Sequence, residues 1–265
     1  DPRGVSPEVV DAFVAGGLNR VSLGVQVLDP GVQARINRVQ SRAVVDAAID
    51  SIRRAGISHL NIDIMYGLPG QTREHVVETA LFAATRNADR IATFGYAHVP
   101  WMKRHQKGIA VADLPAGEAR FRQAEAAAVT LMEAGYTQIG FDHFAAPNDA
   151  LAIAERAGHL RRNFQGYTDD NAIALIGFGA SAISSLPGLI YQNASDTAAY
   201  REQTAAGLPV ARGVKLTEAD VRTGRVIEKI LCDFAVNVPG DLLIAACPLL
   251  SPMIMDGLAE LSGTR

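Results

Sequence analysis

The chain has 265 residues, of which 48% are hydrophobic, and a formal net charge of −3. This length exceeds one average domain, and the apolar content is sufficient for a large core. The slightly acidic balance argues against a protein that binds nucleic acid through a basic surface. Cys232 and Cys247 fit neither a disulfide framework nor a metal-site spacing, so we expect reduced thiols and a cytoplasmic location. No uninterrupted apolar run is long enough for a membrane span.

The first half of the chain alternates extended and helical patterns. Strands are predicted at 20–26, from 59 into a turn that ends at 69, and at 90–98. Helices are predicted at 5–17, 29–37, 41–55, 72–85 and 116–134. Strands that alternate with helices in this way indicate βαβ crossovers and a parallel sheet with helices packed outside it.

Beyond Gly135 the pattern changes to short apolar pieces separated by polar turns. The pieces 139–141, 173–178 and 182–183 resemble strands, and helices return at 195–206 and 217–234. We therefore predict an α/β protein with two domains, 1–135 and 136–265.

The strand that begins at His59 has two chemically different faces. Side chains alternate along a strand, so one face carries Leu60, Ile62 and Ile64, and the other carries Asn61, Asp63 and Met65. A buried carboxylate is costly unless it is paired, so Asp63 needs a partner. That partner is either a ligand at the carboxyl end of the strand or an internal salt bridge to Arg20 or Arg38. The strand alone leaves both open.

Three consecutive strands present a small or polar residue near their carboxyl ends. These residues are Gln26, Asp63 and Ala97. In a βα barrel, ligands bind at that edge. Arg38 could reach the same rim with a guanidinium suited to a carboxylate, although a surface arginine would look the same in the sequence.

A second dense stretch lies at 160–168. It combines two arginines, two amides, two aromatic rings and a hydroxyl without a helical or strand period. Upstream of it, Asp142 stands beside His143, a pair that is usually a structural hydrogen bond.

Several motifs together resemble one known family. They are GVQ (24–26), INR (36–38), IDIMYGLPGQT (62–72), YAHVP (96–100), ADLP (112–115), GFDHFA (140–145), RRNFQGYT (161–168) and GFGASAIS (177–184). Over essentially the whole chain, the sequence resembles oxygen-independent coproporphyrinogen III oxidase (dehydrogenase), a radical S-adenosylmethionine (SAM) enzyme of haem biosynthesis. GFDHFA and RRNFQGYT separate the oxidase from the related haem chaperones, which carry a His-Asn-x-x-Tyr arrangement in place of RNFQGY.

The resemblance implies a partial (β/α)6-type radical SAM barrel with a smaller, largely helical C-terminal domain that covers the substrate. It also implies a 4Fe-4S cluster and two molecules of SAM. The expected reaction is the oxidative decarboxylation of two propionates of coproporphyrinogen III to vinyl groups, which gives protoporphyrinogen IX. We expect no nucleic-acid or membrane partner and a monomer.

Family positions assign roles to individual residues. Gln26, Arg38, Asp63 and Ala97 fall where the family contacts SAM, chiefly the second molecule. Ile183 falls where the cluster-bound SAM is packed, and Phe164 and Gln165 match positions close to the same cofactors. For the tetracarboxylate substrate, the nearest cationic candidates are Arg161 and Arg162, followed by Lys103 and Arg104.

Two family segments do not occur in this sequence. The Cys-x3-Cys-x2-Cys loop that holds the cluster and the glycine motif for the SAM amino group are not found, so we expect the cluster ligands outside it. Asp1-Pro2 resembles the end of the family's Glu-x-Asp-Pro, and 256–261 resembles the lead-in to a terminal β-hairpin. We interpret the sequence as a fragment.

Two other functions remain as alternatives. A haem-binding or haem-chaperone protein on the same fold would offer His98, His105 or His143 to iron without turnover. A phosphate-binding barrel aldolase or isomerase is disfavoured, because no glycine-rich turn precedes a helix after the last strand.

Overall fold

The computed structural model describes residues 1–263, apart from the side chain of His105. The chain divides into two compact units, Asp1–His159 and Leu160–Arg265. This division does not coincide with the domain boundary expected near Gly135.

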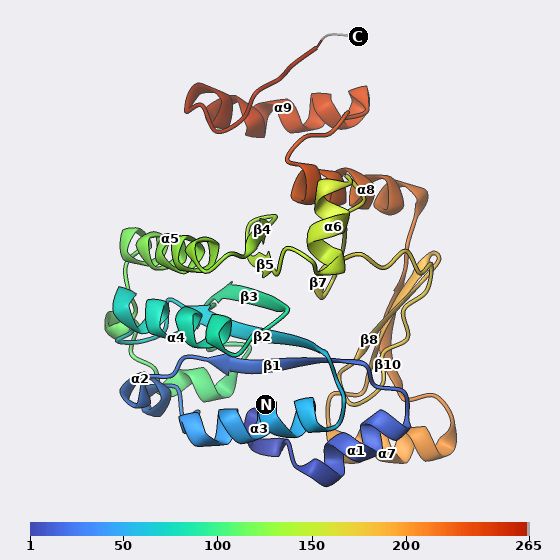
Figure 1. Ribbon diagram of the computed structural model, residues 1–265. Coiled ribbons are helices and arrows are strands. Elements are labelled where there is room, and N and C mark those ends of the chain that lie inside the picture. Colours follow the sequence, from blue (N-terminus) through green and yellow to red (C-terminus); the bar gives the residue numbers. More distant parts are fainter. Residues whose placement is uncertain (264–265) are drawn as a thin grey trace. The chain divides into compact units, whose positions relative to one another are not determined.

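A five-stranded sheet in the order β1-β2-β3-β5-β4 forms the centre of the first unit (Figure 1). Its strands are β1 (Arg20–Gln26), β2 (His59–Tyr66), β3 (Arg90–Gly95), β4 (Thr137–Ile139) and β5 (His143–Ala145). The first three strands are parallel, as predicted, whereas β5 runs antiparallel to both β3 and β4. The β4–β5 hairpin therefore extends the first unit well past Gly135.

Helices connect the strands of the first unit. They are α1 (Pro7–Ala15), α2 (Pro30–Arg35), α3 (Arg42–Arg54), α4 (Arg73–Thr85), α5 (Gly117–Glu133) and α6 (Ala150–Arg156). Side chains of Ser6, Asp29, Ser41 and Thr72 accept hydrogen bonds from the first turns of α1 to α4, which satisfies backbone donors that a helix leaves open. The segment between β3 and α5 contains two short 3-10 helices, η2 (Arg104–Gly108) and η3 (Val111–Asp113).

The core of the first unit is anchored by one row of apolar side chains across the sheet. Leu23, Ile62, Ile91 and Phe144 are paired from strand to strand, and each is at most 1% exposed. The same core includes buried residues of α3, α4 and α5. Leu60, Ile62 and Ile64 are buried, so the predicted apolar face of β2 is confirmed.

The next row along the strands consists of Gly24, Asp63, Ala92 and His143, which are also paired in register. We call it the Asp63 row. Since successive side chains of a strand point to opposite faces, this row faces away from the helix-covered core.

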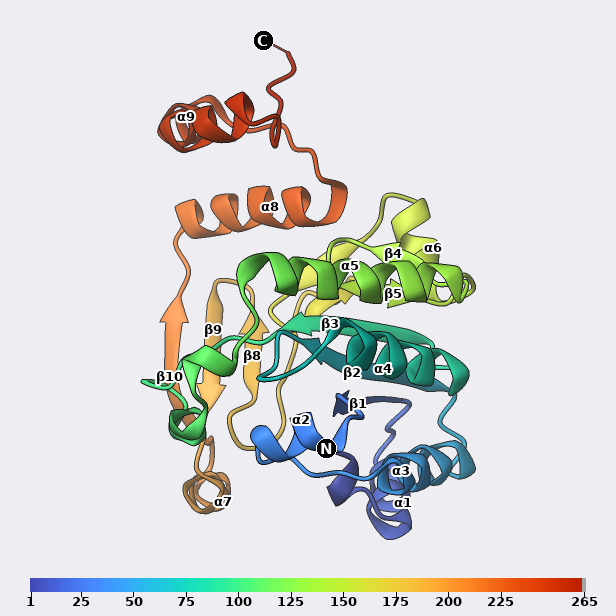
Figure 2. The same cartoon turned by 90° about the vertical axis from the view of Figure 1, so that its left-hand side faces the viewer.

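The second unit contains the sheet β10-β9-β8, the hairpin β6–β7 and the helices α7 to α9 (Figure 2). Its strands are β6 (Arg161–Asn163), β7 (Gly166–Thr168), β8 (Ile183–Leu186), β9 (Leu189–Asn193) and β10 (Val210–Lys215). The helices α7 (Thr197–Ala206) and α8 (Glu218–Asp233) match the predicted ranges closely, whereas α9 (Gly240–Met255) was not predicted. The piece at 173–178 forms no strand and makes only an isolated bridge through Leu175. Among residues 1–263, no helix combines the length and hydropathy that crossing a bilayer requires.

We expect Ile62→Ala to lower the free energy of unfolding of the first unit by about 2–5 kcal/mol, because it leaves a cavity in the middle of the apolar row. Denaturant unfolding followed by circular dichroism measures this loss. Val39→Ala is the control, because Val39 is 62% exposed and its truncation should change stability by less than about 0.5 kcal/mol. Equal effects of the two substitutions would contradict the assigned register.

Candidate functional site

Asp63 lies in the middle of a small polar cluster on β1 and β2. The hydroxyl of Ser22 donates to both carboxylate oxygens of Asp63, at 3.2 and 3.1 Å, and the amide of Asn61 donates to Oδ1 at 2.6 Å. Burial raises the pKa of Asp63, and these two hydrogen bonds oppose the shift because they favour the charged form. Neutral donors therefore hold the carboxylate in place, while burial makes its ionisation less favourable than in water.

The salt bridge considered for Asp63 is not formed. Within the described part of the chain, Arg20 pairs with Asp149 at 3.8 Å and Arg38 with Asp1 at 3.6 Å, and no ion pair includes Asp63. The strand register also keeps Asp63 out of the helix-packed core. The salt bridge to Arg20 or Arg38 was therefore wrong, and a ligand at Asp63 stays a prediction.

The carboxyl end of β1 is distorted where it approaches Asp63. The pairing of β1 with β2 shifts between Gly24 and Gln26, and Gln26 has a positive φ of 66°. Arg38 Nη2 donates to the Gly24 carbonyl at 2.8 Å. A Cβ at position 24 would lie 2.5 Å from Gln26 Nε2 and 3.0 Å from Arg38 Nη2. A side chain at position 24 would therefore displace the Gln26 amide, because this amide and the Arg38 guanidinium lie directly over Gly24.

The irregular end of β1 between Gly24 and Gln26 is called the bulge below. Three buried polar atoms around it have no hydrogen-bond partner in residues 1–263. They are Gln26 Oε1, Arg38 Nε and Gln40 Oε1. Burial also lowers the pKa of Arg38, with the nearby charge of Arg3 acting in the same direction. Buried polar groups without partners are uncommon in folded proteins and call for an explanation such as a ligand or an ordered water.

The buried side-chain amides of Gln33 and Gln40 hold the backbone at the end of β1 through hydrogen bonds. Gln33 Nε2 donates to the Val27 carbonyl at 2.8 Å, and Gln33 Oε1 accepts from the Gln40 backbone N–H at 3.0 Å. The Gln40 side chain in turn donates to the carbonyl of Val25. Both glutamines are 2% exposed. They tie the end of β1 to the segment after α2 that carries Arg38.

Ala97 lies just past β3, which ends at Gly95 instead of continuing to the predicted residue 98. The backbone around it is fixed by Gln106, which donates to the Ala97 carbonyl at 3.1 Å and accepts from the Val99 N–H at 2.6 Å. The Ala97 side chain is exposed.

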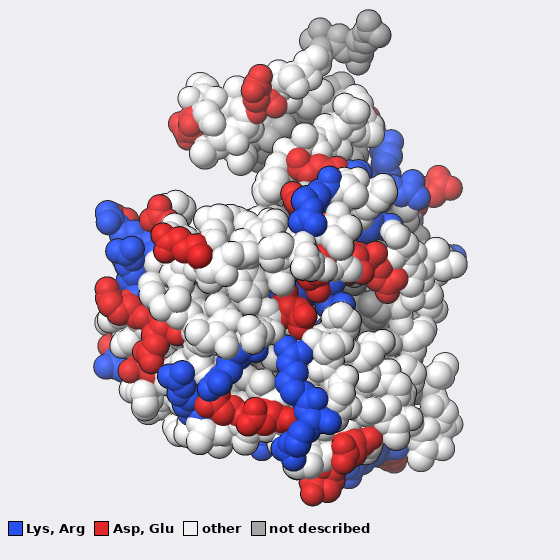
Figure 3. Space-filling model, viewed as in Figure 1, with Lys and Arg blue, Asp and Glu red and all other residues white. Residues whose placement is uncertain are grey.

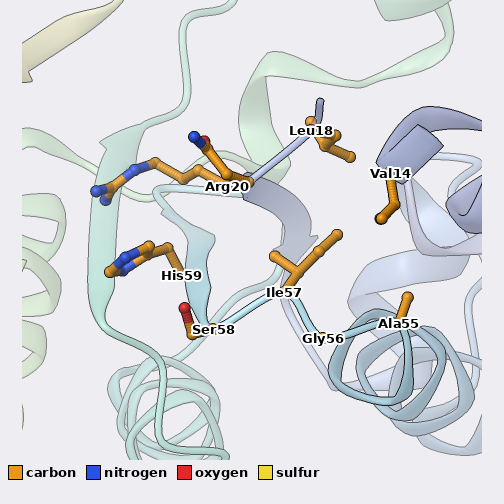
Figure 4. A pocket seen from close by; sticks show the side chains of 9 residues that line it. Val14, Leu18, Arg20, Ala55, Gly56, Ile57, Ser58 and His59 are labelled. Carbon is orange, nitrogen blue, oxygen red and sulfur yellow. The ribbon is translucent and has the colours of Figure 1, made fainter. Parts of the chain in front are cut away.

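A cavity of about 380 Å³ lies at the opposite, amino ends of β1 and β2 (Figure 4). Leu18, Arg20, Ile57 and His59 are among the residues that line it. None of the predicted site residues does so. We therefore do not assign this cavity to the site around Asp63.

In the second unit, the stretch at 160–168 forms the β6–β7 hairpin, so its expected lack of strand structure was wrong. Phe164 and Gln165 occupy the turn, where Phe164 is 45% exposed and Gln165 N–H donates to Asn163 Oδ1 at 2.8 Å. Arg161 Nε donates to Glu228 Oε1 at 2.6 Å, which raises the pKa of Arg161. The Arg162 guanidinium lies 4.3 Å from the centre of the Tyr167 ring.

Ile183 begins β8, next to a glycine-rich loop. Gly177 N–H donates to Ser184 Oγ at 2.9 Å, and the Asn193 amide donates to the carbonyls of Gly177 and Gly179 at 3.1 and 3.0 Å. These bonds fix the backbone against which Ile183 lies.

The histidines proposed as iron ligands have the following surroundings. Tyr96 Oη lies 3.3 Å from His98 Nδ1, and His143 Nδ1 lies 2.6 Å from Asp142 Oδ1. The side chain of His105 lies outside the described residues. No group of three or more His, Cys, Asp or Glu side chains in the described part could hold a metal ion, so the residues present do not provide the ligand set of a 4Fe-4S cluster.

Comparison with known proteins finds a family model and several named relatives that are similar to this chain. Residues 1–83 match the Radical SAM superfamily. The whole chain is 44% identical to the oxygen-independent coproporphyrinogen III oxidase of Bradyrhizobium diazoefficiens and covers 61% of that protein. A solved structure of coproporphyrinogen III oxidase from Escherichia coli, described as a radical SAM enzyme, superposes with a TM-score of 0.86 at 36% identity.

The chain is homologous to the oxygen-independent coproporphyrinogen III oxidases. The superposition includes 99% of this chain and 63% of the Escherichia coli structure, and the chain covers 53% of the Paracoccus denitrificans relative, to which it is 44% identical. The chain thus spans roughly half to two thirds of the length of the relatives it matches. The α/β radical SAM fold expected from the sequence is confirmed.

The residues around Asp63 fit the SAM that this family implies. SAM carries an ammonium group, a carboxylate and ribose hydroxyls, and so offers both donors and acceptors. The bulge presents unpartnered acceptors on Gln26 and Gln40 and an unpartnered donor on Arg38, beside the carboxylate of Asp63. Sequence reasoning missed Ser22, Asn61 and the two amides Gln33 and Gln40. Of these four residues, only Ser22 and Asn61 could have been recognised from the sequence, because each lies at an alternate position on the polar face of its strand, with Gln26 or with Asp63.

Charges on the face of the molecule shown in Figure 3 are mixed. Lysine and arginine side chains lie interspersed with aspartate and glutamate there, without a broad basic patch. That face therefore lacks the electrostatic footprint of a polyanion-binding protein.

We expect Asp63→Asn to leave the protein at least as stable at neutral pH. Because the pKa of Asp63 is raised on folding, the wild type loses stability relative to the variant as pH rises from the ordinary aspartate range through the raised pKa. Below that range both side chains are neutral, and the difference should disappear. Thermal melts of both proteins across this pH range measure the effect. A loss of about 3–5 kcal/mol in the variant would instead indicate a broken buried ion pair.

Proposed function

We propose that the protein to which this chain belongs converts coproporphyrinogen III to protoporphyrinogen IX by radical SAM chemistry. Similarity over 89–100% of this chain to enzymes named for coproporphyrinogen III oxidation supports the substrate class. The observation that carries the proposal is the group of unpartnered buried atoms on Gln26, Arg38 and Gln40, next to the half-buried carboxylate of Asp63, which forms no ion pair within the described residues.

We assign these residues to the binding of SAM. Gln26, Arg38, Asp63 and Ala97 would contact the second of two SAM molecules, while Ile183 would pack against the first. Asp63 offers a carboxylate to an ammonium or to ribose hydroxyls, and Arg38 offers a guanidinium to a carboxylate. The Ser22 and Asn61 donors keep Asp63 in one orientation, so binding does not require it to reorganise.

The chemistry that the bound cofactor supplies is hydrogen abstraction from the β-carbon of a substrate propionate, after which carbon dioxide and one electron leave and a vinyl group forms. Two of the four propionates would react. The chain's own contribution is to bind, to orient and to exclude water. Phe164 and Gln165, on the turn of the β6–β7 hairpin, are proposed to contact the cofactors, since an exposed aromatic ring on a short turn can bury apolar ligand surface.

Arg161 and Arg162 are the proposed partners of the substrate propionates. The guanidinium of Arg161 already pairs with the carboxylate of Glu228, so a propionate would have to share this guanidinium with Glu228 or displace it. The 4Fe-4S cluster would be held by residues other than those described, the expected location is the cytoplasm, and the expected form is a monomer.

The proposal is tested in the full-length protein under anaerobic conditions, with Asp63→Asn compared with the wild type. Loss of one charge-assisted contact should weaken SAM binding about 10- to 100-fold and lower the formation of 5′-deoxyadenosine and of protoporphyrinogen accordingly. Asp113→Asn is the control, because Asp113 is half exposed and pairs with Arg35 on the surface. Normal turnover in Asp63→Asn, or absence of turnover in the wild type, would refute the assignment.

For the hairpin, we expect Phe164→Ala combined with Gln165→Ala to abolish decarboxylation while haem affinity stays unchanged. The reason is that the pair would contact the cofactors of the reaction and would not ligate iron. Product analysis and haem titration of the same preparations separate the oxidase from a haem carrier. Full turnover in the double variant would favour the haem-carrier alternative.

A further inference from the structure

Arg120 lies on α5, which packs along β2 and β3 (Figure 2). Its guanidinium Nη2 donates to the carbonyl of Tyr96 at 2.9 Å. A Cβ at Gly67 would lie 2.9 Å from Arg120 Nε, and a Cβ at Gly95 would lie 3.3 Å from Arg120 Nη2. The guanidinium is therefore packed against the backbone where β2 and β3 end, and the two glycines leave room for it.

This contact differs from the ion pairs that other arginines of the first unit form. Arg122, two residues further along α5, pairs with Glu118 at 2.7 Å. Arg120 has no carboxylate partner within residues 1–263, and its printed hydrogen bond goes to a backbone carbonyl. Arg120 thus holds backbone at the carboxyl end of the sheet.

Gln106, in η2, holds the residues that follow Tyr96. Its Nε2 donates to the Ala97 carbonyl at 3.1 Å, and its Oε1 accepts from the Val99 N–H at 2.6 Å. Gln106 is 7% exposed, so water competes little for these two hydrogen bonds. Together, Arg120 and Gln106 hold segment 96–99 at three backbone groups.

Segment 96–99 needs such support because β3 ends at Gly95. Beyond that residue no strand ladder fixes the backbone, and ordering a loop costs conformational entropy. A ligand that had to order the loop on binding would lose affinity, whereas a loop that is already held in place avoids this cost. Ala97 itself is exposed, so the segment is held through its backbone while this side chain stays accessible.

We propose that Arg120 and Gln106 are positioning residues that hold segment 96–99 in the conformation in which Ala97 meets SAM. This inference rests on the proposed function, which places Ala97 in contact with SAM. Neither side chain has to touch the ligand. Since Arg120 also packs against Gly67, directly after β2, it links the position of Ala97 to the strand that carries Asp63.

The test uses the full-length protein with Arg120→Met, Gln106→Met and the combination of both. Methionine keeps an unbranched side chain of similar length but cannot donate these hydrogen bonds. Arg120→Lys is the conservative variant, because an ammonium can still donate to the Tyr96 carbonyl. Arg122→Met is the matched control on the same helix, since the Arg122 side chain is 68% exposed. SAM and coproporphyrin III are titrated separately, and thermal melts accompany each titration.

We expect Arg120→Met to bind SAM about 3- to 10-fold more weakly, as loss of one hydrogen bond predicts, and Gln106→Met to lose more because two bonds are removed. Affinity for coproporphyrin III should not change. Arg120→Lys should recover most of the SAM affinity, and Arg122→Met should match the wild type. Because both residues act on one segment, the double variant should lose less than the product of the two single effects.

A merely structural role predicts lower melting temperatures with unchanged SAM affinity in the folded variants, and that result overturns the proposal. Equal weakening of SAM and coproporphyrin III binding also overturns it, as does a lysine variant that binds SAM as weakly as Arg120→Met. If Gln106→Met does not fold, Gln106→Glu replaces it, because glutamate still accepts from the Val99 N–H. The proposed function fails separately, when the wild type does not bind SAM.

Discussion

The strict alternation of side chains across the sheet of the first unit is the constraint on which the site depends. The apolar row from Leu23 to Phe144 is fully buried, and the polar Asp63 row is the neighbouring row across the same four strands. A slip of one residue would put Asp63 among the helices and an isoleucine at the polar face. An unpaired carboxylate in that core would cost several kcal/mol, roughly. The core therefore determines the direction of Asp63, although none of its residues belongs to the site.

The bulge at the end of β1 is the one place where this alternation is broken. A regular strand would continue past Gly24 without a bend, and the Gln26 side chain would not come back over Gly24. The positive φ of Gln26 and the shift in register instead fold its amide back over Gly24, beside Arg38. The strand carbonyls that lose their ladder partners are taken up by buried amides, among them that of Gln40. Irregular backbone of this kind is found beside binding sites because it redirects a side chain that a regular strand could not place there.

Patterns that depend on neighbouring residues could be predicted from the sequence. The two faces of β2, the caps at Ser6 and Thr72 and the parallel order of β1 to β3 follow from periodicity and local chemistry. Pairings between distant segments could not. No local signal shows that β5 joins β3 or that Gln40 reaches back to the end of β1. Helix α9 was missed because its local sequence signal is misleading. Pro248 and Pro252 lie inside it, and proline there removes a hydrogen bond and normally ends a helix.

The same distinction explains why the Asp142–His143 pair looked unremarkable in the sequence. Adjacent residues on a strand point to opposite faces, so an Asp-His dipeptide does not by itself place both groups in one site. Here Asp142 belongs to the turn between β4 and β5, and its carboxylate reaches the imidazole that begins the next strand. The antiparallel pairing of β5 with β3 then brings that imidazole into the Asp63 row. The pairing of β5 with a strand far away in the chain thus determines which face of the sheet this imidazole occupies, and only the fold reveals it.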